Sequence, residues 1–220
     1  MFEDKINFLK SKIIEMGNLA VHMLEKSING LIQKDKNILL ELIEVDEPKM
    51  NELEVEIDEL CINFIARYQP EASILRNLAM ALKMNNDLER IGDMAVNIAQ
   101  SALFLIERPQ LKPLIDIPLM AKETIQMIKD GIEAFINLDS ELAVSICQRD
   151  DLIDSYRDQI LRELITYMIS DPSSIERAIH LERISRNIER IADLATNIGE
   201  NVFYIVKGKL IKHGRYKDIL

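Results

Sequence analysis

Two acidic motifs with the same spacing lie one hundred residues apart. Residues 88–98 read LERIGDMAVNI, and residues 188–198 read IERIADLATNI. In each motif two acids and an amide follow one another at intervals of four residues: Glu89, Asp93 and Asn97, then Glu189, Asp193 and Asn197. Side chains four residues apart share one face of an α-helix, with about 5–6 Å between their Cβ atoms. Carboxylates at that distance could share a hard cation.

A second acidic line accompanies each motif. If two such lines face each other, four oxygen-bearing side chains collect in one groove, and like charges raise the pKa of each carboxyl until a cation neutralises them. The alternative is a solvated polar face on which Arg90 and Arg190 form weak local ion pairs. Spacing alone leaves both interpretations open. The accompanying residues are Glu47, Asn51, Glu54 and Asp58 in the first half, and Asp150 and Asp154 in the second.

The apolar pattern predicts helices that could carry these residues. Apolar residues recur at intervals of three and four, which is typical of amphipathic helices with one buried face. The breaks fall near residues 34–36, at 69–70 and over 107–113. We expect helices over 116–137 and 140–170 and a last one ending near residue 207. Pro48 should kink or restart its helix, and Asp171 followed by Pro172 should cap one.

Helical geometry predicts which way the acids point. The apolar face of the third helix centres on Ile91 and Ala95. At 100° per residue, Glu89 and Asp93 lie about 170° from that direction, so they should face outward. Short connections force neighbouring helices to be antiparallel. We therefore predict an all-α fold, a tandem duplication of an antiparallel three-helix bundle with six long helices, divided into residues 1–108 and 109–220.

Composition excludes several classes of function. The net charge of −10 and pI near 4.9 disfavour nucleic-acid binding. The start, MFEDKINFLK, does not have the pattern of a secretory signal, and no apolar run is long enough to span a membrane. Cys61 and Cys147 fit buried, reduced thiols in the cytoplasm. Nucleotide-binding, serine-hydrolase and ExxH di-iron motifs are absent from the sequence, so we expect a protein that is not an enzyme.

Longer stretches of the chain resemble one family. DLERIGDMAVNIA and NIERIADLATNIGE resemble the duplicated ExxxD signature of the PhoU family of phosphate-uptake regulators. LEVEIDELC, IARYQPEASILR, RDDLIDSYRDQILRELITYM, DPSSIERAIHLERISRNIERIAD and YIVKGK resemble it as well. The resemblance implies cytoplasmic, often homodimeric, non-enzymatic proteins that negatively regulate phosphate uptake at the inner face of the membrane. They would couple a phosphate-specific ABC transporter, through its ATPase, to a sensor histidine kinase.

The resemblance also implies metal ligands, because some members bind multinuclear iron, zinc or other cation clusters through these carboxylates. Met94 and Leu194 stand where the family often has His, so both sites depart from the family pattern. Asn51 is a neutral ligand that weakens the first site, so the second bundle, with four carboxylates, should hold cations better. Oxygen donors favour Mg, Mn, Ca or oxidised iron over zinc. By position, the ligands are Glu47, Asn51, Glu89 and Asp93 in the first bundle, and Asp150, Asp154, Glu189 and Asp193 in the second.

Two further functions stay open at this point. One is a metal-storage protein or metal-dependent enzyme built on the same bundle. The other is an accessory protein of a different phosphate transporter. In any of these roles, an acidic surface without an anion-binding nest repels free phosphate. Phosphate would then be sensed through the conformation of the transporter or through phosphate bound to a metal cluster.

Overall fold

The computed structural model describes residues 2–211, and across them the chain forms only helices and their connections. The predicted all-α fold with six long helical segments is confirmed, although two of these segments are interrupted. In the first half they are α1 (Phe2–Gln33), α2 (Lys36–Glu41), the π-helical turn η1 (Leu42–Asp46), α3 (Glu47–Tyr68) and α4 (Ala72–Ile106). In the second they are α5 (Asp116–Asn137), α6 (Ser140–Cys147), α7 (Asp150–Ser170), the 3₁₀ turn η2 (Pro172–Ser174) and α8 (Ile175–Lys207).

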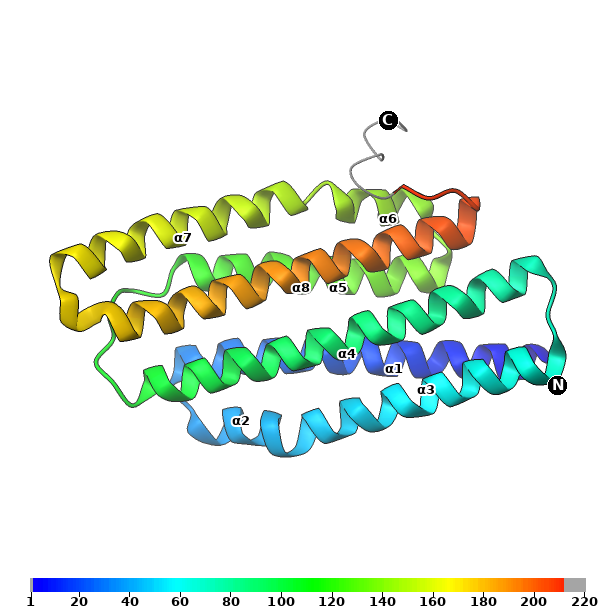
Figure 1. Cartoon of the computed structure of the whole chain (residues 1–220), viewed down its shortest axis with the longest axis horizontal. Coiled ribbons are helices and arrows are strands. Elements are labelled where there is room, and N and C mark those ends of the chain that lie inside the picture. Colours follow the sequence, from blue (N-terminus) through cyan, green and yellow to red (C-terminus); the bar gives the residue numbers. More distant parts are fainter. Residues whose placement is uncertain (1, 212–220) are drawn as a thin grey trace.

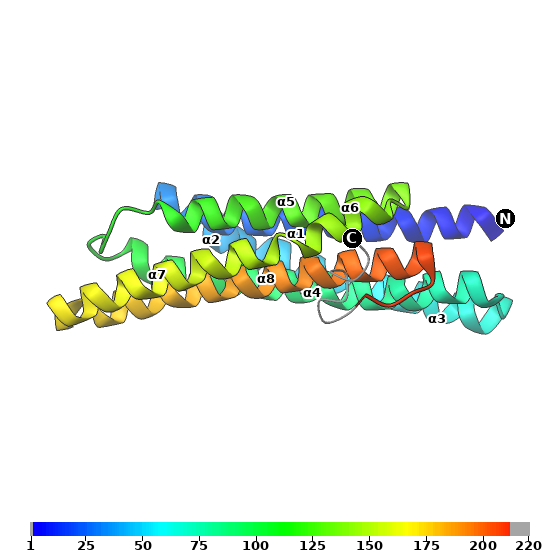
Figure 2. The ribbon, with the colours of Figure 1, turned by 90° about the horizontal axis from the view of Figure 1, so that it is seen from above.

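The helices run along one long axis, and the α3–α4 and α7–α8 hairpins project toward opposite ends (Figure 1). In the view from above, α1 and α5 form one layer, while α4 and α8 lie side by side in the other (Figure 2). One cluster of buried apolar side chains includes residues from both halves. The two bundles therefore share a core across the α4–α8 and α1–α5 contacts. The division at residues 108 and 109 stays a prediction.

The duplication is visible in backbone geometry at the end of the first helix of each half. Lys34 and Leu138 have left-handed backbones, with φ of 54° and 53°. The next residue is an aspartate in both halves, and its side chain accepts hydrogen bonds from two backbone N–H groups of the following helix. The backbone N–H groups of Asp35 and Asp139 each donate to a carbonyl five residues earlier, at 3.0 Å. Both halves thus end and restart a helix by the same capping arrangement.

The second helical segment is interrupted in both halves. The kink or restart predicted at Pro48 takes the form of a π-helical turn, because η1 continues without a gap into α3 and Pro48 lies in the first turn of α3. The prediction of one helix over 140–170 is wrong, because α6 ends at Cys147 and α7 begins at Asp150. The cause is tertiary: at the break, the Arg149 side chain pairs with two acids of α5, at residues 123 and 130.

The third helix of each half begins just after a proline, as Pro70 and Pro172 precede α4 and α8. The predicted cap at Asp171 is confirmed, since its Oδ1 accepts a hydrogen bond from the backbone N–H of Ser173 at 3.0 Å. This bond caps the 3₁₀ turn, and α8 follows that turn directly.

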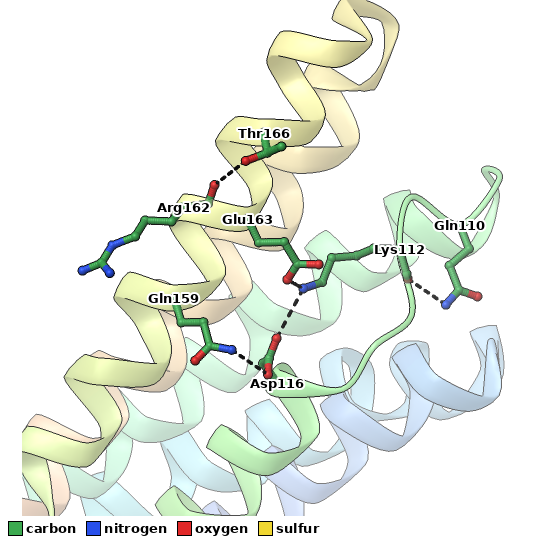
Figure 3. A network of polar contacts seen from close by, with 7 residues as sticks. All are labelled: Gln110, Lys112, Asp116, Gln159, Arg162, Glu163 and Thr166. Carbon is green, nitrogen blue, oxygen red and sulfur yellow. Dashed lines mark hydrogen bonds and ion pairs between the residues drawn. The ribbon is translucent and has the colours of Figure 1, made fainter.

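The connection between the halves is held by a buried lysine (Figure 3). The Lys112 side chain is 2% exposed, and its ammonium pairs with Glu163 of α7 and, at 3.5 Å, with Asp116 at the start of α5. Gln110 donates a hydrogen bond to the Lys112 carbonyl at 2.9 Å. A buried ammonium needs such partners, because an unpaired charge is costly to desolvate. The connection is therefore anchored to α5 and α7.

Candidate functional site

The eight predicted ligand positions share one regular exposure pattern. In each i, i+4 pair, the first residue is half-buried and the second is exposed. The first residue of each pair thus lies against the bundle, while the second reaches into solvent. Neither member of any pair points into the packed core, whereas neighbours such as Ile91 and Ile191 are fully buried. The pairs are Glu47 and Asn51, Glu89 and Asp93, Asp150 and Asp154, and Glu189 and Asp193.

Four carboxylates from α7 and α8 come together in the second half, and we call Asp150, Asp154, Glu189 and Asp193 the second carboxylate cluster. Burial raises the pKa of Asp150 to about 6, and the nearby charges of Asp193 and Asp154 add to the rise. Asp193 stays accessible to solvent, but the protein packed around its base desolvates it in part and raises its pKa, with a further contribution from Glu189. All four predicted ligands therefore lie within electrostatic range of one another, and their negative charges repel.

An arginine that sequence reasoning missed lies within this cluster. Arg157 Nη1 is 3.5 Å from Glu189 Oε1, and Nη2 donates to Asp158 Oδ1 at 2.7 Å. Burial raises the pKa of Glu189, and the Arg157 guanidinium opposes that rise. Arg157 lies three residues after Asp154, so it shares a helix face with that ligand. That spacing is the signal that could have identified it.

The first half assembles a related group on α3 and α4. Burial raises the pKa of Glu89, and the charges of Asp93 and Glu54 add to the rise. The α3 charge that acts on Glu89 is thus Glu54 rather than Glu47, whose place is at the start of α3. Glu54 belonged to the acidic line in the sequence but not to the ligand set. We call Glu54, Glu89 and Asp93, together with the predicted ligands Glu47 and Asn51 in the preceding two turns of α3, the first carboxylate cluster.

One other member of the acidic line is engaged elsewhere. Asn85 is almost fully buried, and its Nδ2 donates to Asp58 Oδ1 at 2.8 Å and to the backbone carbonyl of Glu54 at 2.9 Å. The same amide thus holds the backbone of α3 at Glu54 and occupies the Asp58 carboxylate. Asp58 therefore serves the packing of α3 on α4, and we do not include it in the cluster.

The two clusters differ in charge at two equivalent positions, where Asn51 matches Asp154 and Glu54 matches Arg157. Glu47 and Asp150 are 103 positions apart, and so are Glu54 and Arg157. Where the first half places Glu54 beside Glu89, the second places Arg157 beside Glu189. Each cluster therefore contains four carboxylates, and the second also contains an internal cation. The expectation that the second bundle binds cations better rests on Asn51 and does not include Glu54 or Arg157. It stays a prediction.

The donor chemistry fits hard cations, although the side chains do not form a closed site. Within residues 4–211, no three His, Cys, Asp or Glu side chains converge closely enough to hold a metal ion as they stand. The second residue of each pair is exposed, so its side chain can change rotamer and bring its oxygens toward those of the first residue at little cost. Donors in both clusters are oxygens without His or Cys, a set that suits Mg, Mn, Ca or oxidised iron.

Other chemically capable residues lie outside these clusters. Cys61 and Cys147 are free and buried, and burial raises the pKa of both thiols to about 12, so neither is poised as a nucleophile. His180 stacks on Phe104 with 3.8 Å between the ring centroids. Within residues 2–211, no helix combines the length and the apolar character that crossing a bilayer would require.

Known proteins share this fold over nearly its whole length. Residues 13–102 and 117–202 each match the PhoU domain. A phosphate-specific transport system accessory protein PhoU homolog from Aquifex aeolicus is 39% identical over 209 residues, covering 95% of this chain and 94% of that protein. The accessory protein PhoU of Escherichia coli (strain K12) is 34% identical over 212 residues, covering 96% of this chain and 88% of that protein.

Two solved structures carry the likeness into three dimensions. PhoU from Pseudomonas aeruginosa matches with a TM-score of 0.92 and 34% identity, covering 95% of this chain and all of that one. The phosphate transport system regulatory protein PhoU from Streptococcus pneumoniae matches with a TM-score of 0.88 and 27% identity, covering 97% of this chain and all of that one. These relatives are named as accessory or regulatory proteins and not as enzymes, in line with the sequence prediction. The chain belongs to the PhoU family.

Proposed function

We propose that this chain regulates phosphate uptake as a non-enzymatic adaptor between the ATPase of a phosphate-specific ABC transporter and a sensor histidine kinase. The observation that carries the proposal is similarity over nearly the full length to relatives named as accessory proteins of phosphate-specific transport. The adaptor would work in the cytoplasm, at the inner face of the membrane, through helical surfaces that the partners recognise.

A reconstituted binding experiment tests the adaptor role. The full chain is immobilised, and the transporter ATPase and the cytoplasmic part of the kinase are passed over it separately and together. We expect both to bind at micromolar concentration, and the ternary complex to respond to phosphate only when the whole transporter is present. Binding to neither partner, with or without divalent cations, would remove the basis for this role. A response to phosphate without the transporter would show direct sensing instead.

We further propose that both carboxylate clusters bind divalent or multinuclear cations at the protein surface. The support is the regular exposure of the eight ligand positions, together with the partial burial and the neighbouring negative charges that raise the pKa of Glu89, Asp150 and Asp193. A bound cation would supply a compensating positive charge that holds the facing helices together. The residues that would hold it are Glu47, Asn51, Glu54, Glu89 and Asp93 in the first half, and Asp150, Asp154, Glu189 and Asp193 in the second.

Elemental analysis distinguishes this role from its alternatives. Protein purified without chelator is analysed for Fe, Mn, Zn, Mg and Ca, and is then assayed for phosphatase and oxidase turnover. Stoichiometric metal without turnover supports the regulatory proposal. Turnover, or iron loading far beyond two clusters, would favour a metal-dependent enzyme or a storage protein. A variant in which all eight carboxylates of the two clusters are changed to their amides provides the matched control.

Homodimer formation stays a proposal, and the structure provides a place to test it. Leu161, Ile165 and Ile169 are exposed at intervals of four along α7, an apolar stripe that the sequence analysis had not identified. Light scattering of the full chain measures its mass, and Ile165→Glu tests whether this stripe contributes. A dimer that is unaffected by Ile165→Glu would place the interface elsewhere.

A further inference from the structure

The sequence offset between the two halves changes by one residue inside η1. From α1 through α2, matching residues are 104 positions apart, as with the capping residues Asp35 and Asp139. In α3 and α7 the offset is 103, which aligns the fully buried Ile57 with the fully buried Ile160. The same offset aligns two further buried pairs, Met50 with Ile153 and Cys61 with Leu164. The first half therefore contains one residue more than the second in this interval.

A π-helical turn is the structure that takes up such a residue, since each of its hydrogen bonds spans five residues instead of four. The turn occupies Leu42–Asp46, the interval in which the offset changes. Glu44 matches Gln148 at the first offset and Asp46 matches Arg149 at the second, which leaves Val45 unmatched. Val45 is an apolar residue with 57% exposure. An inserted residue has no matching place in the core, so its side chain is expected to be exposed, as that of Val45 is.

An ion pair of opposite polarity lies at the same place in both halves. Lys26 on α1 matches Asp130 on α5 at the offset of 104. Lys26 Nζ is 2.8 Å from Asp46 Oδ2, and these two side chains are 14% and 11% exposed. In the second half, the Arg149 guanidinium pairs with Asp130, with exposures of 22% and 15%. The first helix thus carries the cation in one half and the anion in the other.

We infer that this anchoring ion pair, Lys26–Asp46 in the first half and Asp130–Arg149 in the second, positions the first ligand of each cluster. Glu47 directly follows Asp46, and Asp150 directly follows Arg149. An inserted residue in an unbroken α-helix would rotate everything after it by 100°. The π-helical turn absorbs that rotation, so the buried face of α3 keeps the register of α7, and Glu47 and Asp150 are both half-buried ahead of it. The positioning of a cation ligand rests on the proposed cation role of the clusters. The anchoring of the helix by the ion pair does not depend on that role.

Exchanging the charges tests the anchoring ion pair. Lys26 Nζ also lies 2.8 Å from Glu41 Oε1, and the matching residue of the second half is Ser145, so the experiment uses a Glu41→Ser chain. Lys26→Asp and Asp46→Arg are made in it singly and together, so that the double variant has the polarity of the second half. Each single variant leaves a largely buried charge facing a like charge, and we expect its Tm to fall by about 5–10 °C. The double variant should recover most of that loss. A double variant no more stable than the worse single variant would overturn the inference.

The same variants, made in an Asp150→Asn, Asp193→Asn background that silences the second cluster, report on positioning. Mn²⁺ binding is measured by electron paramagnetic resonance below the Tm of each variant. We expect each single variant to weaken binding at least fivefold and the double variant to restore it. Unchanged Mn²⁺ affinity in folded single variants would overturn the positioning role. If the wild-type chain binds no Mn²⁺, the cation proposal itself fails, and the Tm measurements still decide the anchoring.

Deleting one residue tests the insertion. Deletion of Val45 is combined with Pro48→Asp, the residue at the matching position 151, because a proline inside an unbroken α-helix is itself destabilising. This double change should remove the π-helical turn, with helicity and Tm close to those of Pro48→Asp alone. The matched control is deletion of Val55, which is 56% exposed but lies within α3, outside the turn. That deletion rotates Ile57 and the rest of the buried face out of the core, so we expect cooperative unfolding to be lost. Equal damage from the two deletions would contradict the insertion.

Discussion

Replacing Arg157 with glutamine should strengthen cation binding at the second carboxylate cluster. The guanidinium lies 3.5 Å from Glu189 and opposes the rise in the pKa of that carboxyl. A bound cation must therefore either displace Arg157 or tolerate its charge. Arg157→Gln removes this competition and keeps a polar side chain of similar reach, so all four carboxylates become available to the incoming ion.

The size of the effect follows from the distance. Two unit charges 3.5 Å apart interact by about 1.2 kcal/mol at the dielectric constant of water. The Arg157 side chain is 38% exposed, so the dielectric constant of water is appropriate here and the lower dielectric constant of a protein interior is not. A change of about 1 kcal/mol corresponds to roughly a fivefold decrease in Kd. Because the charges are solvent-accessible, the difference should shrink toward zero at about 1 M salt.

Titration with Mn²⁺ at low salt and pH 7, in a Glu89→Gln, Asp93→Asn background, assigns the change to the second cluster. Glu54→Gln is the matched variant, because Glu54 occupies the equivalent position in the first half. In a background with Asp150 and Asp193 neutralised, Glu54→Gln should weaken Mn²⁺ binding. If Arg157→Gln left the affinity unchanged or lowered it, the assignment of Arg157 as a competing cation would be refuted.

Three further predictions concern stability and metal content. Asp193→Ala should lower the metal content measured by elemental analysis and shift the Tm in circular dichroism by no more than about 2 °C, because an exposed carboxylate contributes little to folding; a larger drop in Tm would show a structural role. Ile191 is fully buried, so Ile191→Asp should cost roughly 4 kcal/mol or more and show as loss of cooperative unfolding; a native melt would contradict the packing described. Burial and the charge of Arg183 lower the pKa of His180 from 6.5, so its contribution to stability is complete above that pH and is lost as the pH falls through the lowered pKa. Urea titrations should therefore show that His180→Phe loses less unfolding free energy than wild type between pH 7 and 5. Equal losses would show that His180 does not contribute to the pH dependence of stability.

Much of the fold follows from local information in the sequence. An amphipathic period with few glycines and prolines commits each segment to helix whatever its neighbours are, which is why the ends of α5 and α8 could be predicted closely. The outward direction of Glu89 and Asp93 follows in the same way, because 100° per residue fixes a side chain relative to its own helix. The duplication is also a property of sequence, since it requires only that two motifs be compared.

Tertiary structure decided everything that depends on which helices become neighbours. Spacing along one helix can show that Arg157 shares a face with Asp154, but it contains no information about the partner across the groove. The proximity of Glu54 to Glu89 and of Arg157 to Glu189 therefore could not be predicted. The break between α6 and α7 has the same origin, because residues 140–170 have a continuous helical pattern and the ion pairs of Arg149 come from α5. Local hydrogen bonding determined where the helices form, while packing of α3 on α4 and of α7 on α8 determined which charges face each other.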